Sequence, residues 1–306
     1  MRSTRTLGVS FCQGRIQLAE VEQGKAPNLL ALAEAETSLD LAQAGIHLSA
    51  EHPQVATLVG ELGDLIKRNK AGAKVVSFAI PPDPIFISII PLSITLQGQA
   101  LTQYLQWELS QYFPETPPKD FVIDAQPLPS TDNTVNPTFV VGVRRRMIGF
   151  LQKVASELRL QLSIVNIDHF CIEKTLQFNY PEISGYNIAL FGLRFGGIDA
   201  SLLKDNVTID YRAFALQQPP DVGKTVAAYL KHLKQRDGVT PPEAILFHGQ
   251  EVPVETIKQL RTDTKKQVLM VNAVRKLTVS GKIYQPFLKE SYRFAAAIGV
   301  GLRSPS

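Results

Sequence analysis

Two β-hairpins, one at the head of each half of the chain, constrain its fold most strongly. The first is predicted from residues 7–20, with a turn around Gly14. The second is predicted from residues 188–203, with a turn that ends at Gly197. Each consists of two apolar segments joined by a turn that contains glycine, which is the sequence pattern of a hairpin. The fold must therefore accommodate two sheets that each begin with an antiparallel pair of strands.

The segments that follow the two hairpins repeat one order of elements. In each half a third strand comes next, then an amphipathic helix, then a short apolar strand. The expected ranges are 28–35, 55–66 and 74–80 in the first half, and 207–215, 222–233 and 244–247 in the second. This weak internal duplication predicts an α/β protein with two related subdomains that face each other across a cleft. A last helix is expected over residues 288–298.

The region from 81 to 164 differs from the two halves in its composition and in the order of its expected elements. It begins with a proline-rich stretch at 81–84, and a short helix is expected over 101–112. Strands expected at 122–125 and 138–143 flank a polar loop. This pattern predicts a small α+β insertion within the first half, entered and left through loops.

Length and composition are those of a soluble globular protein. A chain of 306 residues is long enough for two domains, and 44% hydrophobic with 20% charged residues is ordinary. The net charge of +4 is small for this length. The dense basic run Arg144-Arg145-Arg146 has no interleaved aromatic residues, so we interpret it as a solvated strand end or loop. Nucleic-acid binding is not expected.

Cysteine usage and targeting signals indicate a cytoplasmic protein. Cys12 and Cys171 lie far apart in apolar surroundings, and we interpret them as buried thiols in a reducing compartment. No apolar signal core follows the N-terminal arginines, and no apolar run approaches the roughly 18 residues that a membrane span needs.

Three local patterns imitate catalytic motifs without their context. Residues 222–225 read Val-Gly-Lys-Thr, like the end of a Walker A loop, but no strand leads into them and they open a predicted helix. Asp168, His169 and Cys171 follow each other so closely that their side chains point in different directions, and we interpret them as packing. The five histidines show no metal-ligand spacing. We therefore predict no catalytic residue and no metal site.

A set of short motifs between residues 79 and 124 carries a family resemblance. In order, they are Ala79-Ile80-Pro81, Ile89-Ile90-Pro91-Leu92, Trp107-Glu108, Gln111-Tyr112-Phe113-Pro114 and Phe121-Val122-Ile123-Asp124. Their order and spacing resemble the PilM group of type IV pilus assembly proteins, which are relatives of the bacterial division protein FtsA and of actin. Segments 139–144, 162–167 and 294–303 fit the same pattern, so the resemblance covers nearly the whole chain.

The resemblance implies an actin-like ATPase fold, which is a duplicated ribonuclease H-like α/β architecture. It places the first subdomain at residues 1–80, completed by 165–186 and 287–306. The inserted subdomain, typical of PilM and FtsA, would span 81–164. The second subdomain would span 187–286.

The first hairpin departs from the nucleotide loop of active members, which bind ATP between the two halves. That loop reads Gly-Ile-Asp-Ile-Gly-Ser-Ser-Ser-Val-Lys-Leu, in which the Asp organises Mg²⁺ while Gly and Ser groups hold phosphate. In this chain the Asp position holds Ser10 and the next Gly position holds Cys12. The third Ser is Arg15, and the Lys is Gln17.

The second loop and the adenosine motif are altered as well. Active members carry Asp-Ile-Gly followed four residues on by Thr, and these positions hold Gly192, Leu193, Arg194 and Ile198. The paired glycines of the adenosine motif are reduced to His248-Gly249-Gln250. Without the two loop carboxylates a metal loses its anchors, and each lost charge-assisted contact is worth about 1.5–3 kcal/mol. We therefore expect a pseudo-ATPase.

No cofactor is expected, and ATP with Mg²⁺ is the open alternative. Arg15 and Arg194 are expected at the surface or between the subdomains, although they could neutralise phosphate without a metal. The residues expected to contact a nucleotide, if one binds, are Ser10, Gln13, Gly14, Arg15, Gly192, Arg194, Gly196, Gly197, His248, Gly249 and Gln250.

The resemblance also implies a partner. PilM binds the short cytoplasmic tail of the inner-membrane protein PilN in a groove between the first subdomain and the insertion. The positions expected to contact such a tail here are Ile85, Ile87, Ile89, Trp107 and Tyr112. The protein would then work as a scaffold at the inner face of the inner membrane, peripheral through its partner, with self-association possible.

Two other functions stay open at this point. One is an active actin-like ATPase whose nucleotide loops have drifted but still work. The other is a small-metabolite kinase of the same superfamily, which is weaker because the sequence shows no aspartate that would serve as a base in the cleft wall.

Overall fold

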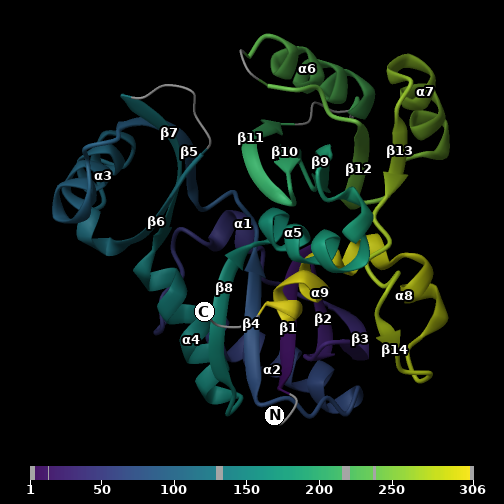
Figure 1. The fold of residues 1–306 in the computed structure, drawn as a ribbon. Helices are drawn as coiled ribbons and strands as arrows, with labels where there is room; N and C mark the ends of the chain where they lie inside the picture. Colours follow the sequence, from purple (N-terminus) through teal and green to yellow (C-terminus); the bar gives the residue numbers. More distant parts are fainter. Residues whose placement is uncertain (1–3, 13, 129–133, 216–220, 237–238, 304–306) are drawn as a thin grey trace.

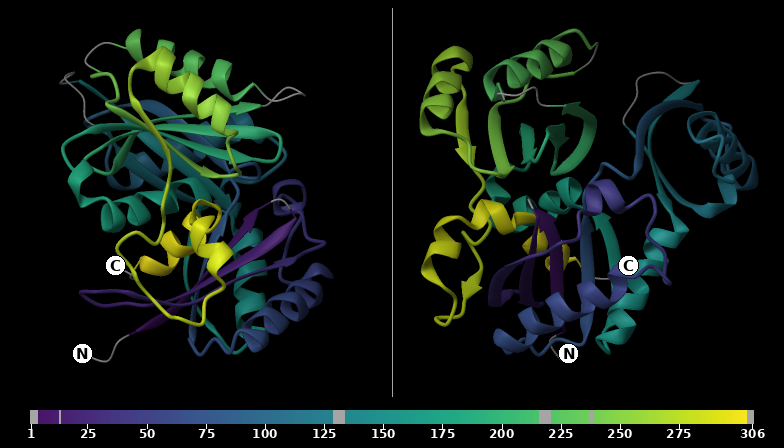
Figure 2. Two further views of the ribbon diagram at one scale, coloured as in Figure 1. Left: turned by 90° about the vertical axis from the view of Figure 1, so that its right-hand side faces the viewer. Right: turned by 180° about the vertical axis from the view of Figure 1, so that it is seen from behind.

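The computed structural model describes residues 4–12, 14–128, 134–215, 221–236 and 239–303. Three β-sheets, of six, five and three strands, organise them. Figure 1 shows the two larger sheets one above the other, with helices α5 (Asp168–Asn179) and α9 (Ala295–Leu302) between them. The third sheet stands to one side of both (Figure 2).

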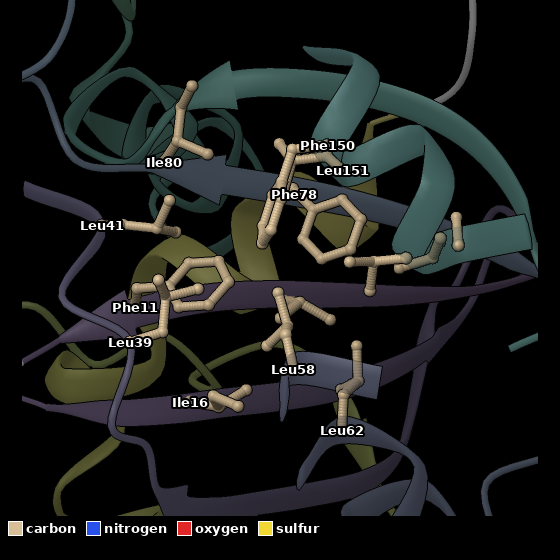
Figure 3. Close-up of a cluster of buried hydrophobic side chains, with 14 of the residues drawn as sticks. Phe11, Ile16, Leu39, Leu41, Leu58, Leu62, Phe78, Ile80, Phe150 and Leu151 are labelled. Carbon is tan, nitrogen blue, oxygen red and sulfur yellow. The ribbon is translucent and has the colours of Figure 1, made fainter. Parts of the chain in front are cut away.

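The first sheet has the strand order β14-β3-β2-β1-β4-β8. Its strands are β1 (Arg5–Cys12), β2 (Arg15–Glu22), β3 (Asn28–Glu36), β4 (Val75–Ile80), β8 (Gln161–Ile167) and β14 (Thr278–Val279). Helices α2 (Gln54–Arg68) and α4 (Arg145–Glu157) cover one face, and α1 (Leu41–Ala44) lies at its edge. Phe78 of β4 packs there against Phe150 of α4 and Leu58 of α2 (Figure 3). The opposite face packs against α5 and α9.

The second sheet has the order β11-β10-β9-β12-β13. Its strands are β9 (Asn187–Arg194), β10 (Gly197–Lys204), β11 (Val207–Ala215), β12 (Ala244–Gly249) and β13 (Gln267–Met270). Helices α6 (Val222–Lys234) and α7 (Val254–Thr264) cover its outer face, where Phe191, Phe247 and Tyr229 pack together. Its inner face contributes Leu190 and Leu246 to the shared α5–α9 layer.

The predicted duplication is confirmed. In the first sheet β1 pairs antiparallel with β2 and parallel with β4, and in the second β9 pairs antiparallel with β10 and parallel with β12. In each half the third strand extends the hairpin, and the amphipathic helix crosses to the parallel strand. The apolar segments joined by glycine-containing turns therefore located both halves correctly.

The third sheet belongs to the insertion and has the order β5-β7-β6. Its elements are β5 (Phe86–Ser93), α3 (Gly98–Tyr112), β6 (Phe121–Pro127) and β7 (Val135–Arg144). Helix α3 covers one face through Leu105 and Leu109. The insertion was predicted to end at residue 164, but the structure ends it earlier. Helix α4 packs on the first sheet, and β8 is a strand of that sheet. Likewise β14, inside the predicted range 187–286, pairs with β3.

The run Arg144-Arg145-Arg146 stands at a strand end, as predicted, but it is not simply solvated. Arg144 is buried, with its guanidinium carbon 5.0 Å from the centre of the Phe113 ring and 5.4 Å from that of Phe121. Arg145 donates to the carbonyl of Lys119 at 2.8 Å. The arginines therefore fasten the insertion to the start of α4.

The predicted last helix over 288–298 is wrong, because the chain forms three short pieces there. These are α8 (Gln285–Lys289), a 3₁₀ turn (Ser291–Phe294) and α9. The buried hydroxyl of Ser291 accepts the backbone N–H of Ala273 at 3.1 Å, which holds the chain away from a continuous helix. Helix α9 is apolar on all sides and fully enclosed but short. No helix in the described ranges is long and apolar enough to cross a membrane.

Close backbone contact between α9 and β1 generates a stability prediction. A Cβ on Gly8 would lie 1.9 Å from the carbonyl oxygen of Ala297, so Gly8→Ala forces the helix off the sheet. We expect it to lower the free energy of unfolding by about 3 kcal/mol in chemical denaturation. Gly60→Ala on the exposed face of α2, where nothing lies within 4 Å, is the control and should add about 0.5–1 kcal/mol. Equal stability of Gly8→Ala and the wild type would contradict the packing.

Candidate functional site

The interdomain cleft opens between the two large sheets, where their leading hairpins turn. It has a volume of about 770 Å³ and is lined by both halves of the chain. The β1–β2 turn borders it at Gly14 and the β9–β10 turn at Gly196, and these glycines have φ angles of 67° and 76°. Such left-handed values favour glycine, which explains these residues without a phosphate.

Most of the residues predicted to contact a nucleotide do line this cleft. They are Ser10, Gly14, Arg15, Gly192, Arg194, Gly196, His248 and Gly249. Gly197 and Gln250 are not among the lining residues, and Gln13 lies outside the described residues. Position alone does not give them a nucleotide-binding role, because their polar side chains are engaged by other residues of the protein.

At the first hairpin, Ser10 and Gln17 replace the Asp and Lys of active members. They face each other across β1 and β2, and the Ser10 hydroxyl donates to Oε1 of Gln17 at 3.1 Å. Both side chains are buried. A neutral, satisfied pair therefore occupies the place where active members keep a metal-organising carboxylate.

At the second hairpin, two histidine rings fill the space beside Gly192. A Cβ at Gly192 would lie 2.6 Å from Nε2 of His248 and 2.8 Å from Nδ1 of His169. These two nitrogens are 3.0 Å apart, and Nε2 of His169 is 2.9 Å from the Ser201 hydroxyl. Burial lowers the pKa of His169 to about 3 and that of His248 well below its usual value, so both rings are neutral near pH 7. The imidazoles thus exclude an aspartate at this position.

Arg194 crosses the cleft, in agreement with its prediction as an interdomain arginine. From the end of β9 its Nε donates to Oδ2 of Asp199 at 2.8 Å, and its Nη1 donates to Oδ1 of Asp83 at 2.6 Å, in the loop after β4. Tyr211 donates its hydroxyl to Oδ1 of Asp199 at 2.8 Å. Burial opposes the charge of Arg194, but Asp199 and Asp83 outweigh it and raise its pKa. The guanidinium lies against Gly197, where a Cβ would be 2.7 Å from Cζ.

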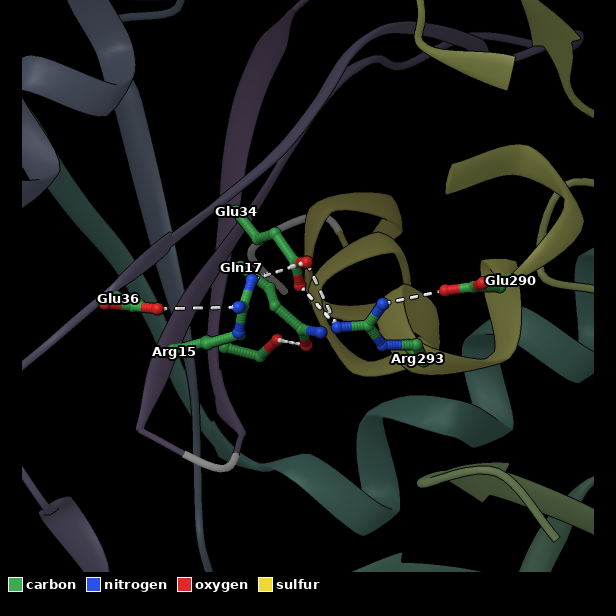
Figure 4. Close-up of polar contacts among 7 residues, drawn as sticks. Arg15, Gln17, Glu34, Glu36, Glu290 and Arg293 are labelled. Atoms are coloured by element: carbon green, nitrogen blue, oxygen red, sulfur yellow. Dashed lines mark hydrogen bonds and ion pairs between the residues drawn. The ribbon is translucent and has the colours of Figure 1, made fainter. Parts of the chain in front are cut away.

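The other arginines of the cleft are also paired (Figure 4). Arg15 donates to Glu34 at 2.9 Å and lies 3.7 Å from Glu36, while Arg293 contacts Glu34 and Glu290 at 2.8 Å each. Glu34 is almost fully buried and takes both arginines. Within the described part of the chain, every arginine that lines the cleft therefore has a carboxylate partner.

Asp168 is a cleft residue that the sequence analysis missed. It begins α5, and its Oδ1 accepts the backbone N–H of His169 at 2.5 Å while the carboxyl lines the cleft. Burial, with Asp199 nearby, raises its pKa to about 8. The interpretation of Asp168 as packing, and the statement that the cleft wall has no aspartate, are therefore wrong. Its place directly after a parallel strand was the available signal.

The cleft does not fit magnesium–ATP in the manner of the active members. Ser10 and Gly192 offer no carboxylate, and the described residues contain no group of three or more His, Cys, Asp or Glu side chains suited to a metal ion. Asp199, the cross-strand neighbour of Gly192, is held by Arg194. Its charge is therefore already compensated.

Cys12 is less buried than predicted. It is half-buried at the cleft, whereas Cys171 is fully buried as expected, and both are free thiols. Burial, together with Asp168, raises the pKa of Cys12 to about 11, so its thiol stays protonated at neutral pH. This gives Cys12 no nucleophilic character.

A second hollow, which we call the insertion groove, separates the third sheet from the first. It has a volume of about 490 Å³. One wall carries Val122, Phe139, Val141 and Val143 from β6 and β7, and the other carries Ile80, Val165, Ile167 and Phe170 from β4, β8 and α5. Polar groups at its rim include Asp124, Glu173 and Arg303. Strands β6 and β8 are the end strands of their sheets.

None of the residues predicted to contact a partner is among those that line the insertion groove. Ile87 and Ile89 pair with Val141 and Phe139, so they lie on the groove side of the third sheet. Trp107 and Tyr112 lie on α3, which covers the opposite side, and both are more than half exposed. Ile85 is buried in the core of the first subdomain.

Comparison with solved structures identifies the fold. A PilM–PilN type IV pilus biogenesis complex matches with a TM-score of 0.77 and 16% identity, over 98% of this chain and 99% of that chain. The ethanolamine utilization protein EutJ from Carboxydothermus hydrogenoformans matches at 0.53 and 11%, over 99% and 91%. The cytoplasmic domain of EpsL, from the type II secretion system of Vibrio cholerae, matches at 0.50 and 9%, over 96% and 94%.

No family model matches the sequence, and no curated protein matches it as a relative. The likeness in structure nevertheless confirms the predicted fold class: the chain has the actin-like ATPase fold. The resemblance to PilM inferred from the motifs is likewise confirmed for the fold, including the inserted subdomain, since the match spans nearly all of both chains.

The raised pKa of Asp168 generates a pH prediction. In the unfolded chain this carboxyl loses its proton near pH 4, whereas in the folded chain it keeps the proton up to about pH 8. Stability is therefore lost as the pH rises through this window, and the loss stops above it. Because the cleft admits solvent, we expect Asp168→Asn to be more stable than the wild type by about 1–2 kcal/mol at pH 8 and equal at pH 4. Melting temperatures that differ by the same amount at every pH would contradict this.

Proposed function

We propose that the protein is a cytoplasmic scaffold of a type IV pilus or related secretion assembly. It binds the cytoplasmic tail of an inner-membrane protein in the insertion groove and so sits at the inner face of that membrane without entering it. It works without ATP hydrolysis. Self-association stays a prediction on which no contact in the structure bears.

The observation that carries this proposal is the extent of the match to the PilM–PilN complex. It spans 98% of this chain and 99% of that chain, and so includes the insertion as well as the duplicated core. The match to the cytoplasmic domain of EpsL points in the same direction, because EpsL is an inner-membrane component of a type II secretion system. Both supports concern assembly machines rather than enzymes.

The insertion groove suits an extended peptide. Its two walls are apolar, so a tail with apolar side chains on alternate positions would bury them. Two sheet edges border it, β6 on one side and β8 on the other, and their outward N–H and C=O groups are free of ladder partners among the described strands. Such edges hold extended segments through backbone hydrogen bonds. Glu173 and Arg303, whose charged groups are 3.4 Å apart, add polar groups to which the backbone of a bound peptide could hydrogen-bond.

The contacts of the cleft argue against hydrolysis. Ser10 and Gln17 satisfy each other, the rings of His169 and His248 close the space at Gly192, and Arg194 is held between two carboxylates. The drifted-ATPase alternative would need these groups to be displaced. Asp168 gives the metabolite-kinase alternative the cleft-wall aspartate that it requires. That alternative still lacks a grouped set of metal ligands and a cation free for phosphate among the described cleft residues.

Peptide binding tests the proposal. The probe is a synthetic peptide with the cytoplasmic tail sequence of the PilN-like inner-membrane protein encoded in the same genome, and the measurement is fluorescence anisotropy. Val141→Asp puts a charge on the groove wall, where desolvation would weaken binding at least tenfold, equivalent to about 1.4 kcal/mol.

Trp107→Ala is the matched control. It removes a large exposed side chain on the other side of the third sheet, so the affinity should stay within about twofold of the wild type. Both variants are checked by circular dichroism. Loss of binding in Trp107→Ala with full binding in Val141→Asp would move the partner to α3. Equal affinity of all three proteins would overturn the groove assignment.

A further inference from the structure

Active members of the resembled family bind ATP and its metal between the two halves, at both hairpin loops. In this chain, side chains of the second half already contact the first half at the same place. Arg194 of β9 reaches Asp83 in the loop after β4 at 2.6 Å. This pair joins the two subdomains directly.

We propose that Arg194, with Asp83 and Asp199, is a built-in lock that takes the place of metal–nucleotide and closes the cleft without any ligand. The inference goes beyond the proposed function, since a scaffold could equally have an open, swinging cleft. It starts from the disagreement between the cleft residues and magnesium–ATP.

The second half holds Arg194 rigidly before it crosses the cleft. Asp199 is 3% exposed and accepts from both Arg194 and Tyr211 at 2.8 Å. The guanidinium rests on Gly197, where even a methyl group would displace it. An arginine so fixed loses little side-chain entropy when it meets Asp83, and this makes its pair stronger than an ordinary surface ion pair.

Tyr211, which donates its hydroxyl to Asp199, also packs against the insertion. The ring of Tyr211 lies 5.2 Å from that of Phe170 on α5 and 6.2 Å from that of Phe139 on β7. Tyr211 therefore packs among aromatic rings from two other elements, α5 and β7, while its hydroxyl holds Asp199. The lock is thus braced on the first subdomain and the insertion as well as on its own sheet.

Neutral histidines provide a second link that needs no ligand. His169 belongs to α5, whereas His248 and Ser201 belong to the second sheet, and the contacts between them measure 3.0 and 2.9 Å. All three side chains are buried. This link fills the space beside Gly192, whereas Arg194 crosses the cleft to Asp83. Together they leave the two halves connected in the absence of nucleotide.

Hydrogen exchange measured by mass spectrometry tests the lock on the full chain without nucleotide. Asp83→Asn removes the charge that Arg194 meets, but it keeps the shape of an exposed loop residue, so the fold should survive. We expect amides in segments 194–199 and 85–88 to exchange about tenfold faster than in the wild type. Scattering at small angles should show a larger radius of gyration.

Glu157→Gln is the matched control, because it removes an ion pair with Lys153 that lies within one helix, α4. It should leave exchange in both segments unchanged. Adding Mg²⁺–ATP should change nothing in the wild type. The lock would be refuted by wild-type exchange rates in Asp83→Asn. It would equally be refuted by a wild type whose cleft segments are fast to exchange and become slow when Mg²⁺–ATP is added. Neither outcome bears on peptide binding in the insertion groove.

Discussion

The ion pair between Arg194 and Asp83 is the contact that, in the proposed lock, holds the cleft between the two halves closed. The two sheets are built as separate layers, and they share the helices α5 and α9 as a common interior. Beyond that interior the cleft would be free to open. Arg194 closes it from a position fixed by its contacts with Gly197 and Asp199, and Tyr211 holds Asp199 in turn. A charge-assisted bond of this kind is stronger than a neutral hydrogen bond, and Arg194 is already held in place by Asp199.

The residues of the nucleotide loops have become internal partners of one another. Ser10 bonds Gln17, Arg15 bonds Glu34, and the histidine rings occupy the side of Gly192. Each change fits the others, because a carboxylate restored at Gly192 would collide with two buried rings. The polar side chains along the cleft therefore pair with one another around its open volume of about 770 Å³. The proposed partner site, the insertion groove, lies between different elements.

Much of the fold could be predicted from the sequence, and the site only in part. Apolar segments joined by glycine-containing turns mark both hairpins, and these signals are local in the sequence. The place of Asp168 in the cleft wall was not predicted, because it depends on where β8 ends relative to the second sheet. No local sequence pattern records that position. Arg194 was predicted between the subdomains, but Asp83 lies more than a hundred residues away, so the pair was hidden. Trp107 illustrates a further limit, since helical spacing cannot tell which face of α3 meets the third sheet.

Calorimetric titration of Mg²⁺–ATP into the purified protein tests the central claim, that side chains have replaced the nucleotide between the two halves, most directly. The account predicts no heat of binding and no rise in melting temperature, with or without Mg²⁺. Tight, Mg²⁺-dependent binding would contradict it. That result would mean that Asp83, Asp168 and Asp199 leave their present partners to organise a metal, and that the cleft is an active nucleotide site.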